Sequence, residues 1–196
     1  MASKLKAVVV LLPEVSLQNR ARESVLRLHR AHNDRLRWVA QPPHVSLKQP
    51  FALESLSEVE RYFDGLAARA PAIHTRLGPV EVQPPPPDAA DSIVWVSVLE
   101  TELLRRLHEQ INEELKAVVA DPSAPFDGAG YRFHMTLGFL AEQPSSSWIP
   151  PELSLVVGEV VTFSEIALFV YDGLPEPGWQ GMTYKVLPLR SSDRLR

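Results

Sequence analysis

The sequence predicts one compact unit of strands and helices, built from two related halves that follow each other along the chain. A four-residue motif of His, apolar, hydroxyl and apolar residues begins at His44 and begins again at His134, 90 positions later. The strand pattern that starts at Leu5 restarts at Ile93, after a similar interval of 88 positions. A chain of 196 residues can bury the core of such a unit, so we expect a single domain over 1–196.

The first half covers about residues 4–83. Its strands are indicated by runs of Val and Leu, its helices by apolar residues spaced three or four apart, and its turns by proline. A capping-box pattern at Ser55–Glu58 marks the start of its second helix. In chain order we expect a strand at Leu5–Leu12, a helix within Val15–Leu36, a short strand carrying the first motif within Trp38–Phe51, a helix from Leu56 to near Pro71, and a strand at Ile73–Val82.

The second half covers about residues 92–189 and follows a stiff polyproline stretch, Pro84–Asp88. Its order repeats that of the first half up to the motif, and it then diverges, because Glu142–Pro151 is rich in Pro and Ser. The expected elements are a strand at Ser92–Leu99, a helix at Glu102–Val119, the second motif strand within Tyr131–Leu140, and further strands within Leu153–Val170 and Met182–Leu189.

Composition excludes several classes of protein. A net charge of -4 argues against binding to duplex DNA, which needs a clustered basic face, although contact with a nucleic-acid end stays open. The chain has no cysteine, so thiolate nucleophiles and cysteine-based zinc sites are excluded. The apolar run Ala7–Leu12 is too short to span a membrane. We therefore expect a cytoplasmic protein without a membrane partner, and a monomer by default.

Each motif carries the groups that phosphate chemistry needs. Alternate side chains of a strand share a face, so His44 projects with Ser46, and His134 projects with Thr136. An imidazole titrates near neutrality and can take or give a proton, while a hydroxyl can donate a hydrogen bond to a phosphate oxygen. Two such couples on opposite sides of one phosphorus atom suit in-line displacement.

The same alternation extends to two cationic residues. Lys48 is expected on the face of the first couple and Arg132 on the face of the second, where both could add positive charge near a phosphate. Either residue could equally be a solvated charge at a strand edge. Kinetics of variants separate these two interpretations.

Two His-x-(Ser/Thr) motifs with apolar x, about ninety residues apart, resemble the motifs of the 2H phosphoesterase superfamily, which includes the LigT-like 2′-5′ RNA ligases. The resemblance spans almost the whole chain. It implies a bilobal α+β fold with an antiparallel sheet in each lobe, helices on the outside and a central cleft between the lobes. In that cleft His44 and Ser46 would oppose His134 and Thr136.

The resemblance also implies an activity. Members open the 2′,3′-cyclic phosphate ends of RNA or nucleotides to 2′-phosphomonoesters without a metal ion or cofactor, and some join RNA ends through a 2′-5′ linkage. On this basis His44 and His134 would be catalytic, with His134 as general base and His44 as general acid, an assignment that the symmetry of the motifs leaves open. Ser46 and Thr136 would bind the phosphate.

Two rival interpretations remain at this point. The first is a non-catalytic module that binds a nucleotide or RNA end in the same cleft, and the second is a metallohydrolase with His44 and His134 as ligands, although no third ligand stands at a recognisable spacing. The remaining histidines are assigned no role and are expected on the surface or on a helix face; they are His29, His32, His74 and His108. Aromatic residues are expected mainly in the core, with Trp179 as one candidate for base stacking.

Overall fold

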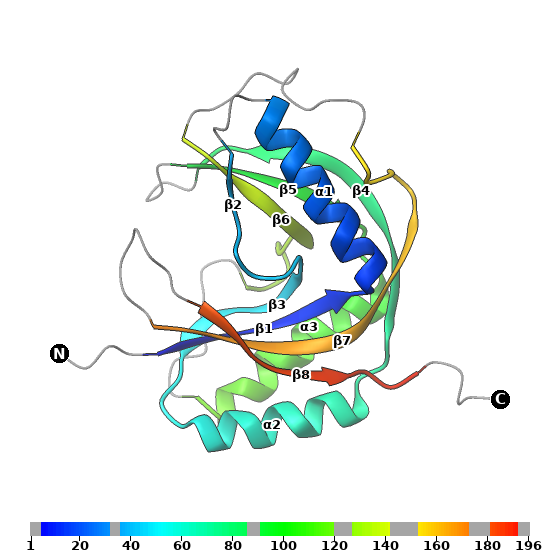
Figure 1. The fold of residues 1–196 in the computed structure, drawn as a ribbon. Coiled ribbons are helices and arrows are strands. Elements are labelled where there is room, and N and C mark those ends of the chain that lie inside the picture. Colours follow the sequence, from blue (N-terminus) through cyan, green and yellow to red (C-terminus); the bar gives the residue numbers. More distant parts are fainter. Residues whose placement is uncertain are drawn as a thin grey trace.

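A computed structural model of the chain describes residues 5–31, 36–85, 91–119, 127–141, 153–172 and 181–191. Three α-helices and eight strands are assigned in these ranges (Figure 1). In chain order they are β1 (Lys6–Pro13), α1 (Val15–Ala31), β2 (Arg37–Trp38), β3 (Val45–Ala52), α2 (Leu56–Arg69), β4 (Ile73–Gln83), β5 (Ser92–Val98), α3 (Glu102–Glu114) with a 3-10 turn at Leu115–Ala117, β6 (His134–Leu140), β7 (Val160–Tyr171) and β8 (Gly181–Pro188).

The strands form one sheet in the order β1-β3-β6-β5-β4-β7-β8, and all of the pairs between these strands are antiparallel. Strand β7 is long enough to pair with β4 near its start and with β1 over the rest of its length. The sheet therefore curls back on itself, which brings β3 next to β6. The α+β class with a mainly antiparallel sheet is confirmed.

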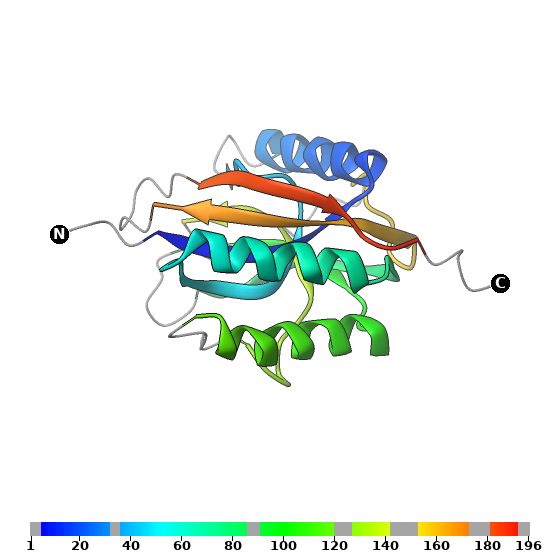
Figure 2. The same cartoon turned by 90° about the horizontal axis from the view of Figure 1, so that it is seen from below.

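Figure 2 shows the strands between α1 at one margin and α3 at the other, with α2 in front of them, and the buried apolar residues of all three helices belong to one hydrophobic cluster. Each helix buries an apolar stripe; in α3 the stripe includes Leu104, Leu107 and Ile111, and the hydroxyl of Thr101 caps its first turn by accepting from the Leu104 amide. Among the described helices, none combines the length and the apolar character that a bilayer crossing requires.

The predicted elements are found, with differences at their ends. Helix α1 ends at Ala31, and Leu36 is a buried residue just before β2. Strand β7 begins at Val160, after a turn at 153–159. Ser55 stands at the N-cap of α2, but its hydroxyl contacts Ser57 and makes no capping bond. The segment Glu142–Pro151, where the second half was expected to diverge from the first, lies outside the described residues, as does most of the polyproline stretch.

The two predicted halves do not occupy separate parts of the sheet. Strand β4 comes from the first half, yet it pairs with β5 and β7 of the second. Strand β7 in turn pairs with β1 of the first half. The halves therefore share one sheet, and the duplication stays a prediction about the sequence.

Gly138 allows the short strand β2 to lie against β6. A Cβ atom there would come within 2.8 Å of the Arg37 carbonyl oxygen and of a Leu36 methyl carbon. Since that contact is too close, Gly138→Ala is expected to destabilise the fold by about 2 kcal/mol, measured by urea unfolding. The matched control is Gly130→Ala, where the new methyl group meets no atom within 4 Å. Equal destabilisation of both variants would contradict this explanation.

Candidate active site

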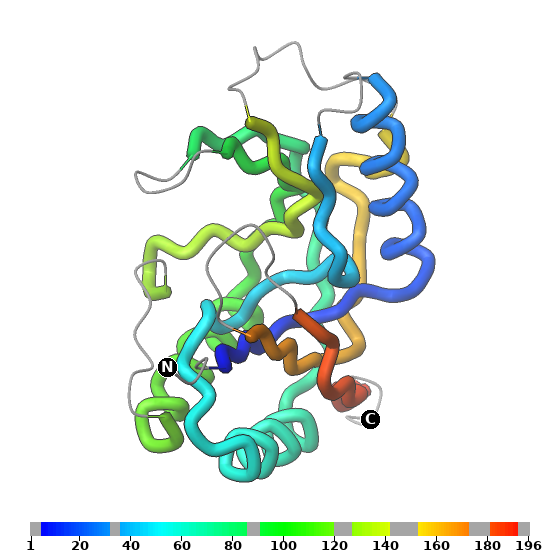
Figure 3. Tube along the Cα trace, turned by 60° about the vertical axis from the view of Figure 1, so that its left-hand side comes forward, coloured from blue at the N-terminus to red at the C-terminus, as the bar shows by residue number. Residues whose placement is uncertain are grey.

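The two motifs meet at a single pair of residues, Val45 of β3 and Met135 of β6. The chain that runs from β2 into β3 passes beside β6, as Figure 3 shows. Because the strands are antiparallel, this register puts the position of His44 opposite Thr136 and that of Ser46 opposite His134. Diagonal positions in such a pair lie roughly 7–8 Å apart, a spacing that leaves room for a phosphate between two imidazoles.

The exposure of the motif residues follows the expected alternation. The apolar members are buried, with 0% exposure for Val45 and Met135, whereas both histidines and both hydroxyl residues are only partly buried. Each couple therefore shares one accessible face of the sheet, and the apolar residues between them pack into the core. His44 also packs edge-on against the buried ring of Phe169, at 4.9 Å between ring centroids.

Both imidazoles are oriented in the same way. Nδ1 of His44 lies 2.8 Å from the carbonyl oxygen of Pro42, and Nδ1 of His134 lies 2.7 Å from that of Arg132. A carbonyl can only accept, so Nδ1 carries the proton in each ring. Nε2 is left to take a proton from a reactant or, once protonated, to give one.

Burial lowers the pKa of both imidazoles in the free protein. It lowers the pKa of His44 to about 4, with a smaller contribution in the same direction from charge on His134. Burial and the nearby Arg132 guanidinium also lower the pKa of His134. A bound phosphate would act in the opposite direction, because a neighbouring negative charge favours the imidazolium form.

The lowered pKa of His44 predicts a loss of stability in acid. The unfolded chain, with a histidine pKa near 6.5, binds more protons between about pH 6.5 and 4 than the folded chain, so stability is present above this window and falls as pH falls through it. When the pH is lowered from 7.5 to 5.5, we expect the free energy of unfolding of His44→Gln to fall by about 1 kcal/mol less than that of the wild type, as measured by urea unfolding. Parallel losses in the two proteins would contradict the assignment.

Trp95 is a site residue that sequence reasoning missed. Strand pairing sets it opposite Thr136, and its ring stacks on His134 with centroids 4.0 Å apart. The Arg132 guanidinium carbon lies 5.3 Å from the centroid of the same indole. Trp95 was expected in the core, and only the β5–β6 register, which the sequence does not specify, could have indicated it.

Glu81 holds this stack together. One of its carboxylate oxygens accepts from Trp95 Nε1 at 3.1 Å and from Arg132 at 2.8 Å, and it also accepts from Ser97 and Gln83. The side chain of Arg132 is 58% exposed, so it shares the neighbourhood of His134 as alternation predicts and can still reach a ligand. Its contact with a phosphate stays a proposal.

Lys48 does not follow the alternation. The β1–β3 ladder shifts register between the Val9 and Val10 pairs, and as a result Leu47 and Lys48, adjacent in sequence, are both buried. The Lys48 side chain is 1% exposed and forms an ion pair with Asp127. Lys48 would have to leave this buried carboxylate to bind a phosphate, so its placement does not support the predicted contact.

A second aromatic group lies behind the first motif. Tyr131 contacts Ser46 through its hydroxyl, which also lies 3.4 Å from Gln49 Nε2, and burial raises the pKa of this phenol. Its ring stacks on His108 at 4.7 Å between centroids. His108 was expected at the surface or on a helix face, and it lies on a buried face of α3. The residue is 1% exposed, and its Nδ1 forms a hydrogen bond with the Leu47 carbonyl oxygen. These residues fix the position of the strand that carries Ser46.

Comparison with known proteins identifies the family. A family model for the 2′-5′ RNA ligase superfamily matches residues 13–175. The chain belongs to this superfamily. The predicted resemblance to the 2H phosphoesterases is confirmed, and the protein is a phosphoesterase-type member of the group. No curated protein matches the sequence.

Solved structures share the fold of this 2H phosphoesterase at low sequence identity. TT0787 of Thermus thermophilus is 15% identical with a TM-score of 0.66, and the match covers 95% of this chain and 99% of that one. E. coli LigT complexed with 3′-AMP is 17% identical with a TM-score of 0.59, over 95% and 98% of the two chains. Kluyveromyces marxianus Usb1 with uridine monophosphate is 14% identical with a TM-score of 0.53, over 96% and 100%.

Proposed function

We propose that this 2H phosphoesterase opens 2′,3′-cyclic phosphate ends of RNA or nucleotides to 2′-phosphomonoesters without a metal ion. The observation that supports this most directly is the Val45–Met135 pairing, which sets two imidazole–hydroxyl couples side by side on one accessible face. Two of the related structures are complexes with 3′-AMP and with uridine monophosphate, which supports a nucleotide as the substrate class. A cytoplasmic location is part of the same proposal.

The chemistry needs two proton transfers and no covalent intermediate. One imidazole takes a proton from water through Nε2 as the water oxygen bonds to phosphorus. The bond from phosphorus to the ribose 3′ oxygen breaks, and the second imidazole, protonated at Nε2, gives its proton to that oxygen. Ser46 and Thr136 donate to the non-bridging oxygens, where negative charge concentrates in the transition state.

From the surroundings of the two rings we propose His44 as the base and His134 as the acid, the reverse of the assignment made from sequence. Burial lowers the pKa of His44 to about 4, so this ring is neutral at pH 7 and its Nε2 lone pair is available to the attacking water. His134 stacks on the indole of Trp95, a ring face that can stabilise an imidazolium. The roles act as a coupled pair, so the pH–rate profile reports both together.

A substrate with a good leaving group distinguishes the two roles. An aryl phosphodiester that releases p-nitrophenolate needs no proton on the departing oxygen, so the variant lacking the acid should retain far more of its activity on this substrate than on a cyclic phosphate. We expect that behaviour from His134→Ala and not from His44→Ala. The opposite result would restore the assignment made from sequence.

The proposed reaction itself is tested with a panel of cyclic phosphates. Turnover of adenosine 2′,3′-cyclic phosphate and of an RNA ending in a cyclic phosphate is measured in the presence of EDTA, and the position of the product phosphate is resolved by NMR. A 2′-phosphate formed at an undiminished rate supports the proposal. Tight binding of AMP without any turnover would favour the binding-module interpretation, and loss of activity in EDTA would favour the metallohydrolase.

The reverse reaction is part of the proposal. A site that activates water against a cyclic phosphate can activate an RNA 5′-hydroxyl in its place, which gives a 2′-5′ linkage without ATP. This is measured by incubating a cyclic-phosphate RNA with a 5′-hydroxyl RNA at high concentration and searching for a joined product that resists a 3′-5′-specific nuclease.

A further inference from the structure

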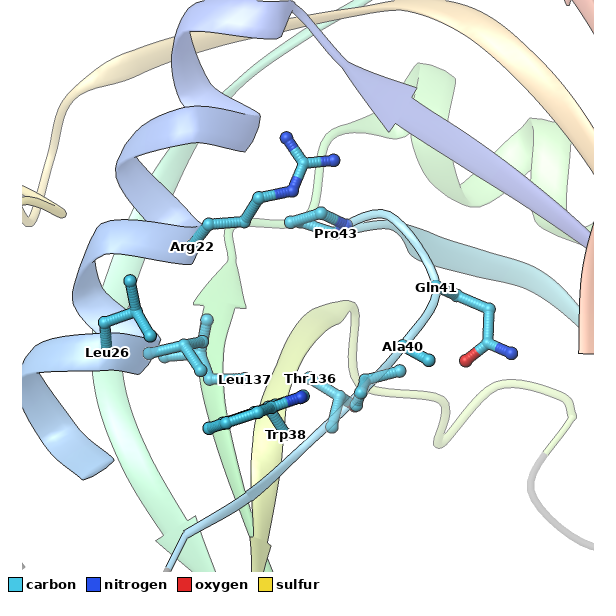
Figure 4. Close-up of a pocket in the computed structure, with 10 residues that line it drawn as sticks. Arg22, Leu26, Trp38, Ala40, Gln41, Pro43, Thr136 and Leu137 are labelled. Atoms are coloured by element: carbon cyan, nitrogen blue, oxygen red, sulfur yellow. The ribbon is translucent and has the colours of Figure 1, made fainter. Parts of the chain in front are cut away.

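A pocket of about 330 Å³ opens directly beside the second motif. It is bounded by α1, by the chain between β2 and β3, and by β6, which contributes Thr136 (Figure 4). Since Thr136 belongs to both the pocket and the proposed phosphate site, a ligand whose phosphate binds between the motifs would have this pocket beside it. The volume lies at the lower end of the range for small-ligand sites and suits one nucleoside.

Two large apolar side chains of the pocket are half exposed. Trp38 and Leu26 are each 51% exposed, although both are large apolar side chains. The ring of His29 meets the Trp38 indole at 4.8 Å between centroids and 64° between planes, which limits its rotation. Strand pairing sets Trp38 opposite Gly138, and the lack of a side chain at Gly138 lets the backbone of β2 approach β6 there. The indole is thus a fixed platform for a planar group.

Arg22 adds a positive charge at the rim of the same pocket, where it extends from α1 toward Pro43 (Figure 4). Its guanidinium donates to the side-chain amide oxygens of Asn19 and Gln18, and within the described ranges it has no ion pair with a carboxylate. The neighbouring Arg20 and Arg27 on the same helix each pair with a glutamate. The charge of Arg22 is therefore available to an anionic group of a ligand.

We propose that this pocket binds the nucleoside that carries the reacting phosphate, with its base against Trp38 and a second, non-reacting phosphate of the ligand on Arg22. The inference rests on the proposed function and narrows its substrate class. A cyclic mononucleotide can occupy only the base site. An RNA end occupies the base site and also supplies the phosphodiester that Arg22 recognises. The protein accordingly prefers RNA ends to cyclic mononucleotides.

The test compares three substrates that share one reacting group. They are 1-O-methylribose 2′,3′-cyclic phosphate, which has no base, adenosine 2′,3′-cyclic phosphate, and the dinucleotide that ends in adenosine 2′,3′-cyclic phosphate. Trp38→Ala should raise KM about 10-fold for the two substrates with a base and leave the base-free substrate unchanged. Trp38→Phe should restore most of the affinity, because it keeps a planar ring.

Arg22→Gln should raise KM several-fold for the dinucleotide only. Arg27→Gln, five residues further along α1 and outside the pocket, is the matched control and should leave KM unchanged for all three substrates. An equal effect of Arg22→Gln on all three substrates would assign the guanidinium to the reacting phosphate. An equal effect of Trp38→Ala on all three would mean that the indole is structural. Either result overturns the corresponding part of the inference.

Experiments can distinguish failure of this inference from failure of the proposed function. If the wild-type protein turns over none of the three substrates, the proposed function fails. The pocket is then tested by calorimetric binding of adenosine 2′-phosphate against 1-O-methylribose 2-phosphate. Tighter binding of the ligand with a base, lost in Trp38→Ala, would still support the base site, and equal binding of the two ligands would overturn it.

Discussion

Replacement of His44 or His134 by alanine is expected to lower kcat on a cyclic phosphate by about 10²–10⁴-fold in each case. Each imidazole bonds a carbonyl oxygen through Nδ1, neither Nε2 has a hydrogen-bond partner among the described residues, and a missing ring removes one of the two proton transfers. The double variant should be little worse than the poorer single variant, because the two groups act as a unit. Initial rates at saturating substrate, across pH 5–9, measure these effects.

The matched control is His74→Ala, which removes an exposed imidazole on β4 and should leave kcat unchanged. Circular dichroism and thermal unfolding of all variants separate lost chemistry from lost fold. If either His44→Ala or His134→Ala retained more than about a tenth of wild-type kcat, two-imidazole catalysis would be excluded, since general acid–base catalysis contributes at least about 10²-fold.

Lys48→Met is expected to destabilise the fold by about 3–5 kcal/mol, the largest effect on stability that we predict. The Lys48 side chain is 1% exposed and its partner Asp127 is 9% exposed, so the substitution leaves a buried carboxylate without its countercharge. Asp127 also accepts from the Gln49 backbone amide at 3.2 Å, which ties β3 to the segment ahead of β6. Urea unfolding at pH 7 gives the change in free energy.

Two further variants make this prediction specific. Replacing both partners, as Lys48→Met with Asp127→Leu, should recover most of the loss, because the buried charge is removed as well. Lys116→Met breaks an ion pair whose side chains are 60% and 74% exposed and should cost less than about 1 kcal/mol. If Lys48→Met kept full stability while kcat/KM fell, the lysine would be a phosphate ligand as first predicted.

The sequence predicted the two half-sites because their information is local. Alternation along a strand requires only the order of residues, and it correctly set each histidine beside its hydroxyl, with Val45 and Met135 behind them. Alternation failed at Lys48, because the irregular pairing with β1 depends on a strand that lies far away in sequence. A bulge of this kind has no signature in the motif itself.

The surroundings of the site could not be predicted, because they depend on cross-strand register. Trp95 becomes a neighbour of His134 only through the β5–β6 pairing, and Glu81 reaches the indole only through β4–β5. Trp38 looked like a core residue by composition, yet it is half exposed because β2 is a two-residue strand at the margin of the sheet. Such relations belong to tertiary structure, which a single sequence leaves unspecified.

The narrowness of the β3–β6 contact has a mechanical consequence. These strands share one paired position, Val45 with Met135, whereas β3 is paired with β1 at five positions and β6 with β5 at six. His44 therefore immediately precedes one ladder and His134 lies in the other, and the joint between the two ladders is a pivot. We expect the distance between the two imidazoles to change by rotation about this pivot. The site could then bind both the strained cyclic ester and the linear product without breaking the pairing of either ladder.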